Sequence, residues 1–173
     1  MAMRPDANGR RRRLVCGKSV ARPERGRVDS THSRAITRRF YEAYDRADRQ
    51  ALARFLSPAC VVHLPVDTAP LDRDEFFEVI ALFATAFTEI RTSVVQEVAE
   101  KDIVVLRWVC HVTHAGAFQG IPATGKRIAI DGVTINRVAD GQIVDHWVTF
   151  DRLRLLEELG AGVDRRVPKA MRT

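Results

Sequence analysis

The fold is decided by the stretch from Thr113 to Gly160, in which residues 116–126 read GAFQGIPATGK and residues 140–151 read DGQIVDHWVTFD. Runs typical of β-strands follow the first motif, and a leucine-rich helix is predicted after Asp151. The second motif places His146, Trp147 and Asp151 close together at the end of an otherwise apolar strand. Buried polar side chains need partners, so these residues indicate either a pocket or a hydrogen-bond network, and we favour a pocket.

The decisive stretch belongs to a longer region of β periodicity. Strands are predicted near 90–99, 103–114, 127–138 and 143–150, with antiparallel pairing through short turns and the longer loop at 116–126. Asp151 then begins a final helix that carries leucines on one face and ends at Gly160.

Helical periodicity upstream of the strands predicts three helices. The first begins at Ser30 or Thr31, the second is capped by Asp48, and the third begins with a capping box of Asp72 and Glu75. The stripe of the third helix holds four of the eight phenylalanines, namely Phe76, Phe77, Phe83 and Phe87.

A short strand at 59–64 is predicted between the second and third helices. Helices followed by a meander of strands indicate an α+β fold rather than a parallel sheet. We expect one strongly curved sheet with helices packed into its concave face, which leaves a conical hollow.

The charge distribution divides the chain. Residues 1–30 hold nine Lys/Arg and three Asp/Glu, whereas residues 31–173 hold nineteen of each. The net charge of +6 therefore lies entirely in residues 1–30, the leader of the chain. A nucleic-acid partner is not expected for the folded part, whose charges balance. We predict a disordered basic N-terminal extension at 1–29, one domain at 30–162 and a polar tail at 163–173. The apolar run after the arginines of the leader is too short for a signal peptide.

Cysteine usage and hydropathy set the expected compartment. Cys16, Cys60 and Cys110 are odd in number and lack the spacing of a disulfide framework or a zinc site. The expected location is therefore cytoplasmic. Apolar runs are too short to span a bilayer, so no membrane association is expected.

The motifs at 116–126 and 140–147, together with Asp151 and the helix that ends at Gly160, resemble the SnoaL-like polyketide cyclase and ester cyclase family. This family belongs to the nuclear-transport-factor-2-like superfamily. Residues 38–42, RRFYE, resemble the opening helix of the family, and the resemblance spans about residues 33–160. It implies a cone formed by a curved antiparallel β-sheet and N-terminal helices that enclose a pocket.

The chain departs from the usual family pattern at several positions. Ala123 stands where a second proline is usual, and Asp145 replaces the commoner glutamate. Val148 occupies a position where many members carry another acid. Thr134 and Asn136 also differ from the frequent choices on their strand.

The resemblance also implies a function. Cyclases of this type close a ring by intramolecular aldol addition on a small hydrophobic carbonyl or ester substrate, without a metal or organic cofactor. An aspartate in a place comparable to Asp151 acts as their general acid/base. For Asp151 the alternative is an N-cap of the final helix, which needs no catalysis. The default oligomer is a homodimer through the outer face of the sheet.

Strand alternation constrains which side chains can share the pocket. Trp147 and Asp151 lie on one face of the last strand and His146 on the other. If Asp151 faces the hollow, Trp147 lines it and His146 points away unless a bulge intervenes. Asp131 and Asn136 also differ in parity, so at most one of them faces the pocket.

A metal site is not predicted. His111 and His114 are three positions apart, so on one strand they face opposite sides and cannot chelate together. The predicted catalytic residues are Asp151 and His146. The predicted substrate contacts are Trp147, His63, His114, Phe118, Tyr44, Phe83, Phe87 and Asn136.

Two other functions stay open at this point. The fold also hosts proteins without enzymatic activity, so the chain could be a module that binds a small hydrophobic ligand or dimerises. An epoxide hydrolase on the same scaffold would need two aspartates and an arginine around a water, and Arg107 in a predicted buried strand is the only pointer to it.

Overall fold

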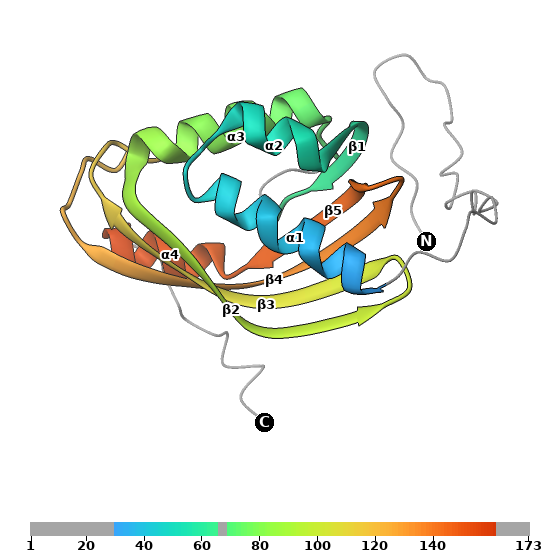
Figure 1. The fold of residues 1–173 in the computed structure, drawn as a ribbon. Coiled ribbons are helices and arrows are strands. Elements are labelled where there is room, and N and C mark those ends of the chain that lie inside the picture. Colours follow the sequence, from blue (N-terminus) through green and yellow to red (C-terminus); the bar gives the residue numbers. More distant parts are fainter. Residues whose placement is uncertain (1–29, 66–68, 162–173) are drawn as a thin grey trace, which may run out of the picture.

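The structure, a computed structural model, describes residues 30–65 and 69–161. Figure 1 shows a curved sheet beneath three helices, α1 (Ser30–Tyr44), α2 (Arg49–Phe55) and α3 (Arg73–Ala86). The other elements are β1 (Leu56–His63), β2 (Phe87–Glu100), β3 (Ile103–His114), β4 (Arg127–Ala139), β5 (Gln142–Phe150) and α4 (Arg152–Leu159). The predicted α+β cone is confirmed.

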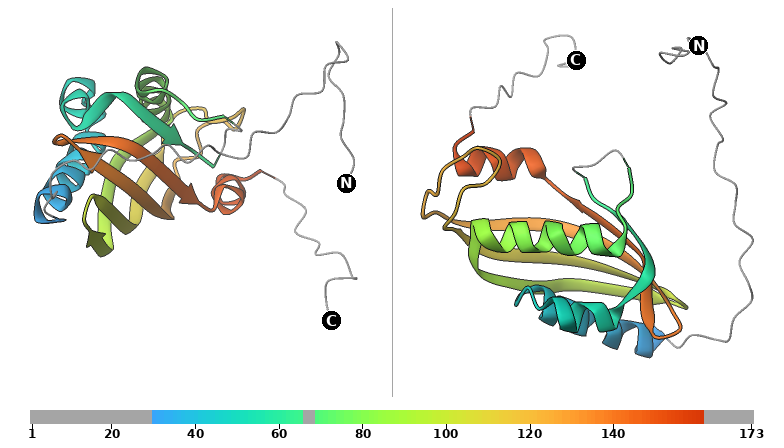
Figure 2. Two further views of the ribbon diagram at one scale, coloured as in Figure 1. Left: turned by 90° about the vertical axis from the view of Figure 1, so that its right-hand side faces the viewer. Right: turned by 90° about the horizontal axis from the view of Figure 1, so that it is seen from above.

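The sheet has the strand order β1-β5-β4-β3-β2. The four strands from β2 to β5 form the predicted antiparallel meander, and β1 adds a parallel pair with β5 at one edge. Figure 2 shows α1, α2 and α3 on one side of the sheet and α4 beyond the end of β5. The sheet is open, so its inner face must be closed by the helices.

The edge strand β1 begins earlier than the sequence predicts. Its first residue is Leu56, and Pro58 lies inside it, in the stretch where the register with β5 shifts between Leu56 and Val61. Proline cannot donate to a strand ladder and is tolerated at edges and irregular pairings. The sequence predicted the strand only from residue 59, with Pro58 just beyond the end of the second helix, and the edge position is the physical reason for the difference.

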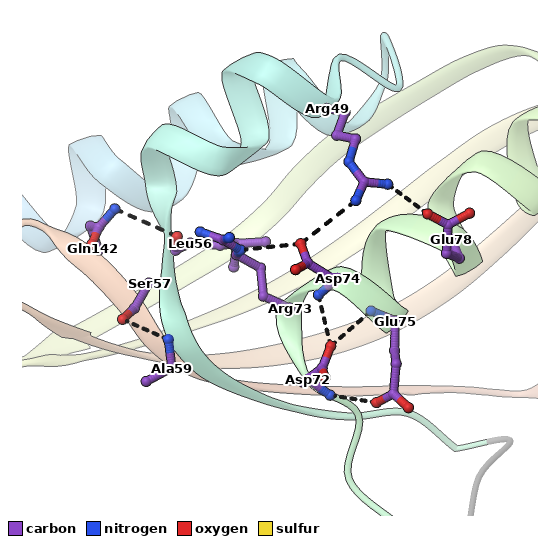
Figure 3. Close-up of polar contacts among 10 residues, drawn as sticks. All are labelled: Arg49, Leu56, Ser57, Ala59, Asp72, Arg73, Asp74, Glu75, Glu78 and Gln142. Atoms are coloured by element: carbon purple, nitrogen blue, oxygen red, sulfur yellow. Dashed lines mark hydrogen bonds and ion pairs between the residues drawn. The ribbon is translucent and has the colours of Figure 1, made fainter.

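The predicted caps of α2 and α3 are confirmed. The Asp48 side chain accepts a hydrogen bond from the backbone N–H of Ala51 at 3.0 Å. Asp72 and Glu75 form the capping box of α3, with Asp72 accepting from the N–H of Glu75 and Glu75 accepting from the N–H of Asp72. Figure 3 shows Arg49 of α2 reaching across to the acidic side of α3. These contacts fix where both helices start.

Burial alternates along β3 and β4, as expected for strands with one face on a core. The inward residues pack against α1 and α3 in one core cluster. Phe87, expected on the stripe of the third helix, is the first residue of β2 and packs against Phe83 at a ring distance of 4.5 Å. The helix therefore ends one residue before the last aromatic of its stripe.

The predicted extension at 1–29 and the tail at 163–173 lie outside the described residues, so these boundaries stay predictions. Within residues 30–65 and 69–161, none of the helices is long and apolar enough to cross a membrane.

Candidate functional site

A cavity of about 230 Å³ lies between α1, α3 and the inner face of the sheet. Its wall is largely aromatic and aliphatic and comes from every layer of the fold. The lining residues are Phe40, Tyr41, Tyr44, Leu64, Phe76, Val79, Leu82, Phe83, Thr92, Trp108, Cys110, Phe118, Gln119, Ile130, His146, Val148, Phe150 and Leu155.

The wall is uncharged. Among the described residues that line the cavity there is no Asp, Glu, Lys or Arg. Asp45 comes near the wall, but its two carboxylate oxygens accept the N–H of Thr92 at 2.8 Å and the hydroxyl of Thr92 at 2.6 Å. The volume lies below the roughly 300–1,000 Å³ of usual ligand sites. The cavity therefore suits a small and neutral molecule.

The predicted parity of β5 is confirmed, because His146 and Trp147 lie on opposite faces, but the face with Trp147 and Asp151 is not the one that turns to the cavity. His146, Val148 and Phe150 face the cavity, whereas Trp147 lies on the outer face and is 37 % exposed. The inward set contains two apolar residues besides the histidine, and apolar area removed from water determines which face turns inward. A bulge at Val144 precedes this part of β5.

Asp151 does not line the cavity. Its side chain is exposed, and one carboxylate oxygen accepts the backbone N–H of Arg154 at 2.9 Å, so Asp151 is the N-cap of α4. These contacts support the alternative that the sequence left open for Asp151, a helix N-cap that needs no catalysis. An acid/base role for Asp151 stays a prediction without a contact to the cavity.

His146 is the titratable side chain that the strand brings into the cavity. Its Nδ1 lies 2.6 Å from Oδ1 of Asn136, its cross-strand neighbour. An amide oxygen can only accept, so Nδ1 carries the proton and Nε2 carries the lone pair. Phe40 and Phe76 pack on the imidazole, each at a ring distance of 5.2 Å. Burial lowers the pKa of His146 to about 3, and the ring is therefore neutral at ordinary pH.

Asn136 was expected to contact substrate, but it lies behind the wall. It is fully buried and outside the lining residues, and its recognised partner is the imidazole of His146. Its role is therefore to fix the tautomer and the orientation of His146. Asp131 faces outward and pairs with Arg154, so the expectation that at most one of Asp131 and Asn136 faces inward is confirmed.

A second polar group on the wall is a chain of three side chains. The indole N–H of Trp108 donates to the hydroxyl of Thr134 at 2.8 Å, and the Thr134 and Tyr41 oxygens lie 2.5 Å apart. Gly132 allows this arrangement, because a Cβ there would overlap the Trp108 indole. Burial raises the pKa of Tyr41 above its ordinary value, so the phenol stays protonated.

His63 and Trp147 form a stacked pair on the outer side of the sheet. Their rings lie 5.0 Å apart and are inclined by 3°. They are cross-strand partners of β1 and β5, and neither lines the cavity. The prediction that they contact a substrate in the pocket is therefore not supported by their position.

His114 is also placed away from the cavity. Its fully buried ring contacts the Thr124 hydroxyl through Nδ1 at 3.0 Å, and its backbone binds Gly125 and Lys126. These contacts hold the loop between β3 and β4. His111 lies on the opposite face of β3, as predicted from the spacing.

Of the aromatic residues predicted to bind substrate, Tyr44, Phe83 and Phe118 line the cavity. Phe87 is buried behind Phe83 and Phe118. Arg107, expected in a buried strand, is exposed on the outer face and donates to Gln96 at 3.0 Å. The arginine that an epoxide hydrolase would need is therefore absent from the described wall.

The sequence interpretation missed Tyr41, Trp108 and Thr134. Tyr41 lies three positions before Tyr44, so it shares the inward face of α1, and this spacing was a usable signal. Trp108 and Thr134 have inward parity on β3 and β4. Their contact depends on Gly132 lying opposite Trp108, which is a matter of register.

The comparisons with known proteins agree with the geometry. The family model described as SnoaL-like polyketide cyclase matches residues 34–159. Aklanonic acid methyl ester cyclase DauD from Streptomyces sp. (strain C5) is 27 % identical over 133 residues, which cover 72 % of this chain and 80 % of DauD. The corresponding cyclase DnrD from Streptomyces peucetius is also 27 % identical over 133 residues, covering 72 % of this chain and 88 % of DnrD.

Solved structures show the same fold. The crystal structure of wild-type IdmH from Streptomyces antibioticus matches with a TM-score of 0.68 and 30 % identity, over 74 % of this chain and 98 % of IdmH. AclR from Streptomyces galilaeus matches with a TM-score of 0.71 and 27 % identity, over 82 % of this chain and 88 % of AclR. The resemblance noted in the sequence is confirmed, and the chain belongs to the SnoaL-like polyketide cyclase family.

Proposed function

We propose that the protein catalyses an intramolecular aldol-type ring closure on a small, neutral carbonyl or ester compound, with His146 as the general base. The observation that carries this proposal is the neutral imidazole in an apolar cavity, with Nδ1 held by Asn136. Nε2 is then the basic atom of the uncharged wall. The role proposed for an aspartate in the family is thus assigned to a different residue of this chain.

His146 is unprotonated at ordinary pH, so its Nε2 can accept a proton. A pKa of about 3 makes its conjugate acid comparable to an ordinary carboxylic acid. In ketosteroid isomerase a carboxylate with a pKa of about 4.6, a somewhat stronger base, serves as the general base. The imidazolium that forms is paired with the enolate, so the charges appear together in a site of low polarity.

The proposed reaction is an isomerisation. Nε2 of His146 takes the proton from the carbon next to an ester or ketone carbonyl, and the enolate carbon then attacks a second carbonyl of the same molecule. One carbon–carbon bond forms, the second carbonyl becomes an alkoxide, and the alkoxide recovers the proton from the imidazolium. The wall contributes mainly by holding the two reacting carbons close together.

The substrate class follows from the wall and from the relatives. A cavity without a charged lining residue among those described disfavours a carboxylate or an amine, because a buried charge needs a partner. DauD and DnrD are named for a methyl ester, in which the acid is masked. We therefore propose a keto ester whose reacting portion fits about 230 Å³.

The test is turnover of aromatic keto methyl esters in D₂O. Wild-type protein is expected to give a product of the same composition with a new ring, detected by mass spectrometry and NMR, and deuterium at the reacting carbon of recovered substrate. His146→Gln is expected to lower turnover by about 10²- to 10⁴-fold, the usual range for loss of a general base. Asp151→Asn keeps an N-capping side chain outside the cavity and is the matched control, expected to retain activity.

The alternative is a non-catalytic module that binds a small hydrophobic ligand. Val148 on the inner face, where many family members carry an acid, is the observation in its favour. Under this alternative the esters bind, but neither ring closure nor deuterium exchange exceeds that of buffer. If Asp151→Asn abolishes turnover and His146→Gln does not, the base is Asp151 and the assignment made here fails.

We also propose a homodimer through the outer face of the sheet. Cross-strand neighbours form a row across all five strands that is apolar except for its last member, namely Val98, Val105, Ile135, Trp147 and His63. Val98 is 66 % exposed and Ile135 is 39 % exposed. A second copy related by a two-fold axis would cover this row with the same row, as isologous interfaces do.

The proposed compartment is the cytosol. Cys60 and Cys110 are free and buried. Burial raises the pKa of their thiols to about 12 and about 11, so they stay protonated. This state is compatible with a reducing compartment.

A further inference from the structure

The chain of Trp108, Thr134 and Tyr41 holds one more polar hydrogen than the hydrogen bonds that it makes. Each of the three side chains brings one polar hydrogen, and the structure shows two hydrogen bonds among them. The indole N–H can only donate, so the Thr134 oxygen accepts it. Thr134 is fully buried, and its hydroxyl makes no further hydrogen bond to the residues that the structure describes. One hydroxyl hydrogen therefore lacks an acceptor among the described residues.

The surplus hydrogen can lie in two places. If Tyr41 donates to Thr134, the Thr134 hydrogen is left in the core without a partner. An unsatisfied buried donor destabilises a fold by roughly 1–3 kcal/mol. If Thr134 donates to Tyr41 instead, the free hydrogen belongs to Tyr41, which lines the cavity. The second arrangement is favoured because a ligand can then supply the acceptor.

We propose that the Tyr41 hydroxyl donates a hydrogen bond to the carbonyl oxygen of the substrate, with Thr134 and Trp108 as positioning residues. As a role in catalysis this rests on the proposed cyclase function. As recognition of a neutral carbonyl acceptor it does not depend on turnover. The proposal adds the atom that would hold the developing enolate oxygen, which the cyclase assignment alone does not name.

The place of Tyr41 relative to His146 suits this role. Thr134 and Asn136 lie two positions apart on the inner face of β4, a rise of roughly 7 Å along the strand. Thr134 supports the donor Tyr41, and Asn136 supports the base His146. Enolisation needs a base at the carbon and a donor at the oxygen of the same carbonyl group. The raised pKa of Tyr41 keeps the phenol a donor rather than a base.

The experiment compares two small ligands of nearly equal shape, 1-tetralone and tetralin, which differ by one carbonyl oxygen. Wild-type protein is expected to bind the ketone about three- to tenfold more tightly than the hydrocarbon, the gain of one neutral hydrogen bond. Tyr41→Phe keeps the ring and should remove this preference while leaving tetralin affinity unchanged. The carbonyl stretch of bound tetralone should lie at lower wavenumber in wild type than in Tyr41→Phe.

Thr134 variants separate positioning from packing. Thr134→Ser keeps the hydroxyl and should keep the ketone preference, whereas Thr134→Val keeps the shape and should reduce it. Equal affinity of wild type for both ligands, absence of binding of either, or an unchanged preference in Tyr41→Phe would overturn the proposal. Because neither ligand can cyclise, a protein without cyclase activity can still show the preference, so the two proposals fail separately.

Discussion

The inner and outer faces of β4 and β5 are built from alternate residues of the same strands, yet they follow different rules. On the inner face His146 is 2 % exposed and uncharged, and its polar partner is another neutral side chain. On the outer face Arg137 pairs with Asp145, and Trp147 is 37 % exposed. A step of one residue along β5 thus separates a dry, neutral surface from a wet surface that carries charge.

The contrast shows which chemistry the cavity can support. Inside, desolvation disfavours charge, so polar groups persist as neutral donors and acceptors that bind one another. Outside, charged side chains pair with one another where water reaches the sheet, and exposed pairs of this kind contribute little to stability. The reaction proposed for the cavity therefore uses a neutral base and neutral donors, and charge appears only during its course.

The largest expected effect comes from placing the same charge on each face. Val138→Asp puts a carboxylate on the fully buried inner face and is expected to destabilise the fold by more than about 4 kcal/mol. Thr149→Asp puts it on the exposed outer face and should change stability by less than about 0.5 kcal/mol. Urea unfolding of both variants measures this, and similar values for the two would break the contrast.

The second effect is a pH dependence that belongs to the inner face alone. The pKa of His146 is lowered from 6.5 to about 3 in the folded chain, so the unfolded chain binds more protons between these values. Stability from this residue is complete above about pH 6.5 and decreases as the pH falls towards 3, by up to about 1.4 kcal/mol per pH unit.

Denaturant unfolding at several pH values tests this dependence. Gln does not titrate, so His146→Gln should lose less unfolding free energy than wild type between pH 6.5 and pH 4. The control Asp151→Asn should show the same pH dependence of unfolding free energy as wild type. An NMR titration of His146 with a midpoint near 6.5 would show that the ring is hydrated and would contradict the neutral inner face.

The third effect concerns the apolar row of the outer face. Ile135→Asp places a charge at the centre of the proposed dimer interface and is expected to weaken association by about tenfold or more, because truncated or charged interface centres lose most of the binding energy. Light scattering after size exclusion gives the mass. Leu153→Asp on α4 changes an exposed leucine outside the row, and it should leave the mass unchanged. A wild-type chain that is monomeric at all concentrations would end the dimer proposal.

The smallest effect lies at the end of β5, where the inner and outer sets meet α4. Asp151→Ala removes the N-cap and should lower stability by about 1 kcal/mol, whereas Asp151→Asn should be nearly neutral because Asn caps as well as Asp. Thermal unfolding compares the two. Equal destabilisation by both variants would mean that α4 is stabilised by the negative charge of Asp151 and not by its N-capping hydrogen bond.

The sequence predicted the elements well because their signals are local. Caps at Asp48 and Asp72, the period-2 runs and Gly160 depend only on neighbouring residues, and each is found where expected. The orientation of β5 was harder. Asp151 attracted attention as a carboxylate, but Val148 and Phe150 share the parity of His146, and this apolar set was the better guide to the inner face.

Other parts of the site depend on contacts between distant segments. The link between Tyr41 and Thr134 joins α1 to β4, and it follows from register and helix placement rather than from any short motif. His63, predicted as a pocket residue, stacks on Trp147 because β1 pairs with β5 in parallel at the sheet edge. A parallel partner at the edge has no local signal, so this contact could not be inferred.

The loop between β3 and β4 has a consequence for how the cavity could change. Phe118 and Gln119 are its contribution to the wall, and it is fastened at its base by His114 and at its tip by a hydrogen bond of 2.7 Å between Arg152 and Gln119. Substitutions at the tip can therefore resize the space for a guest molecule without touching the strands. Because the loop tip and the strands are separate, the cavity can be adapted to ligands of different size while the residues that determine the fold stay unchanged.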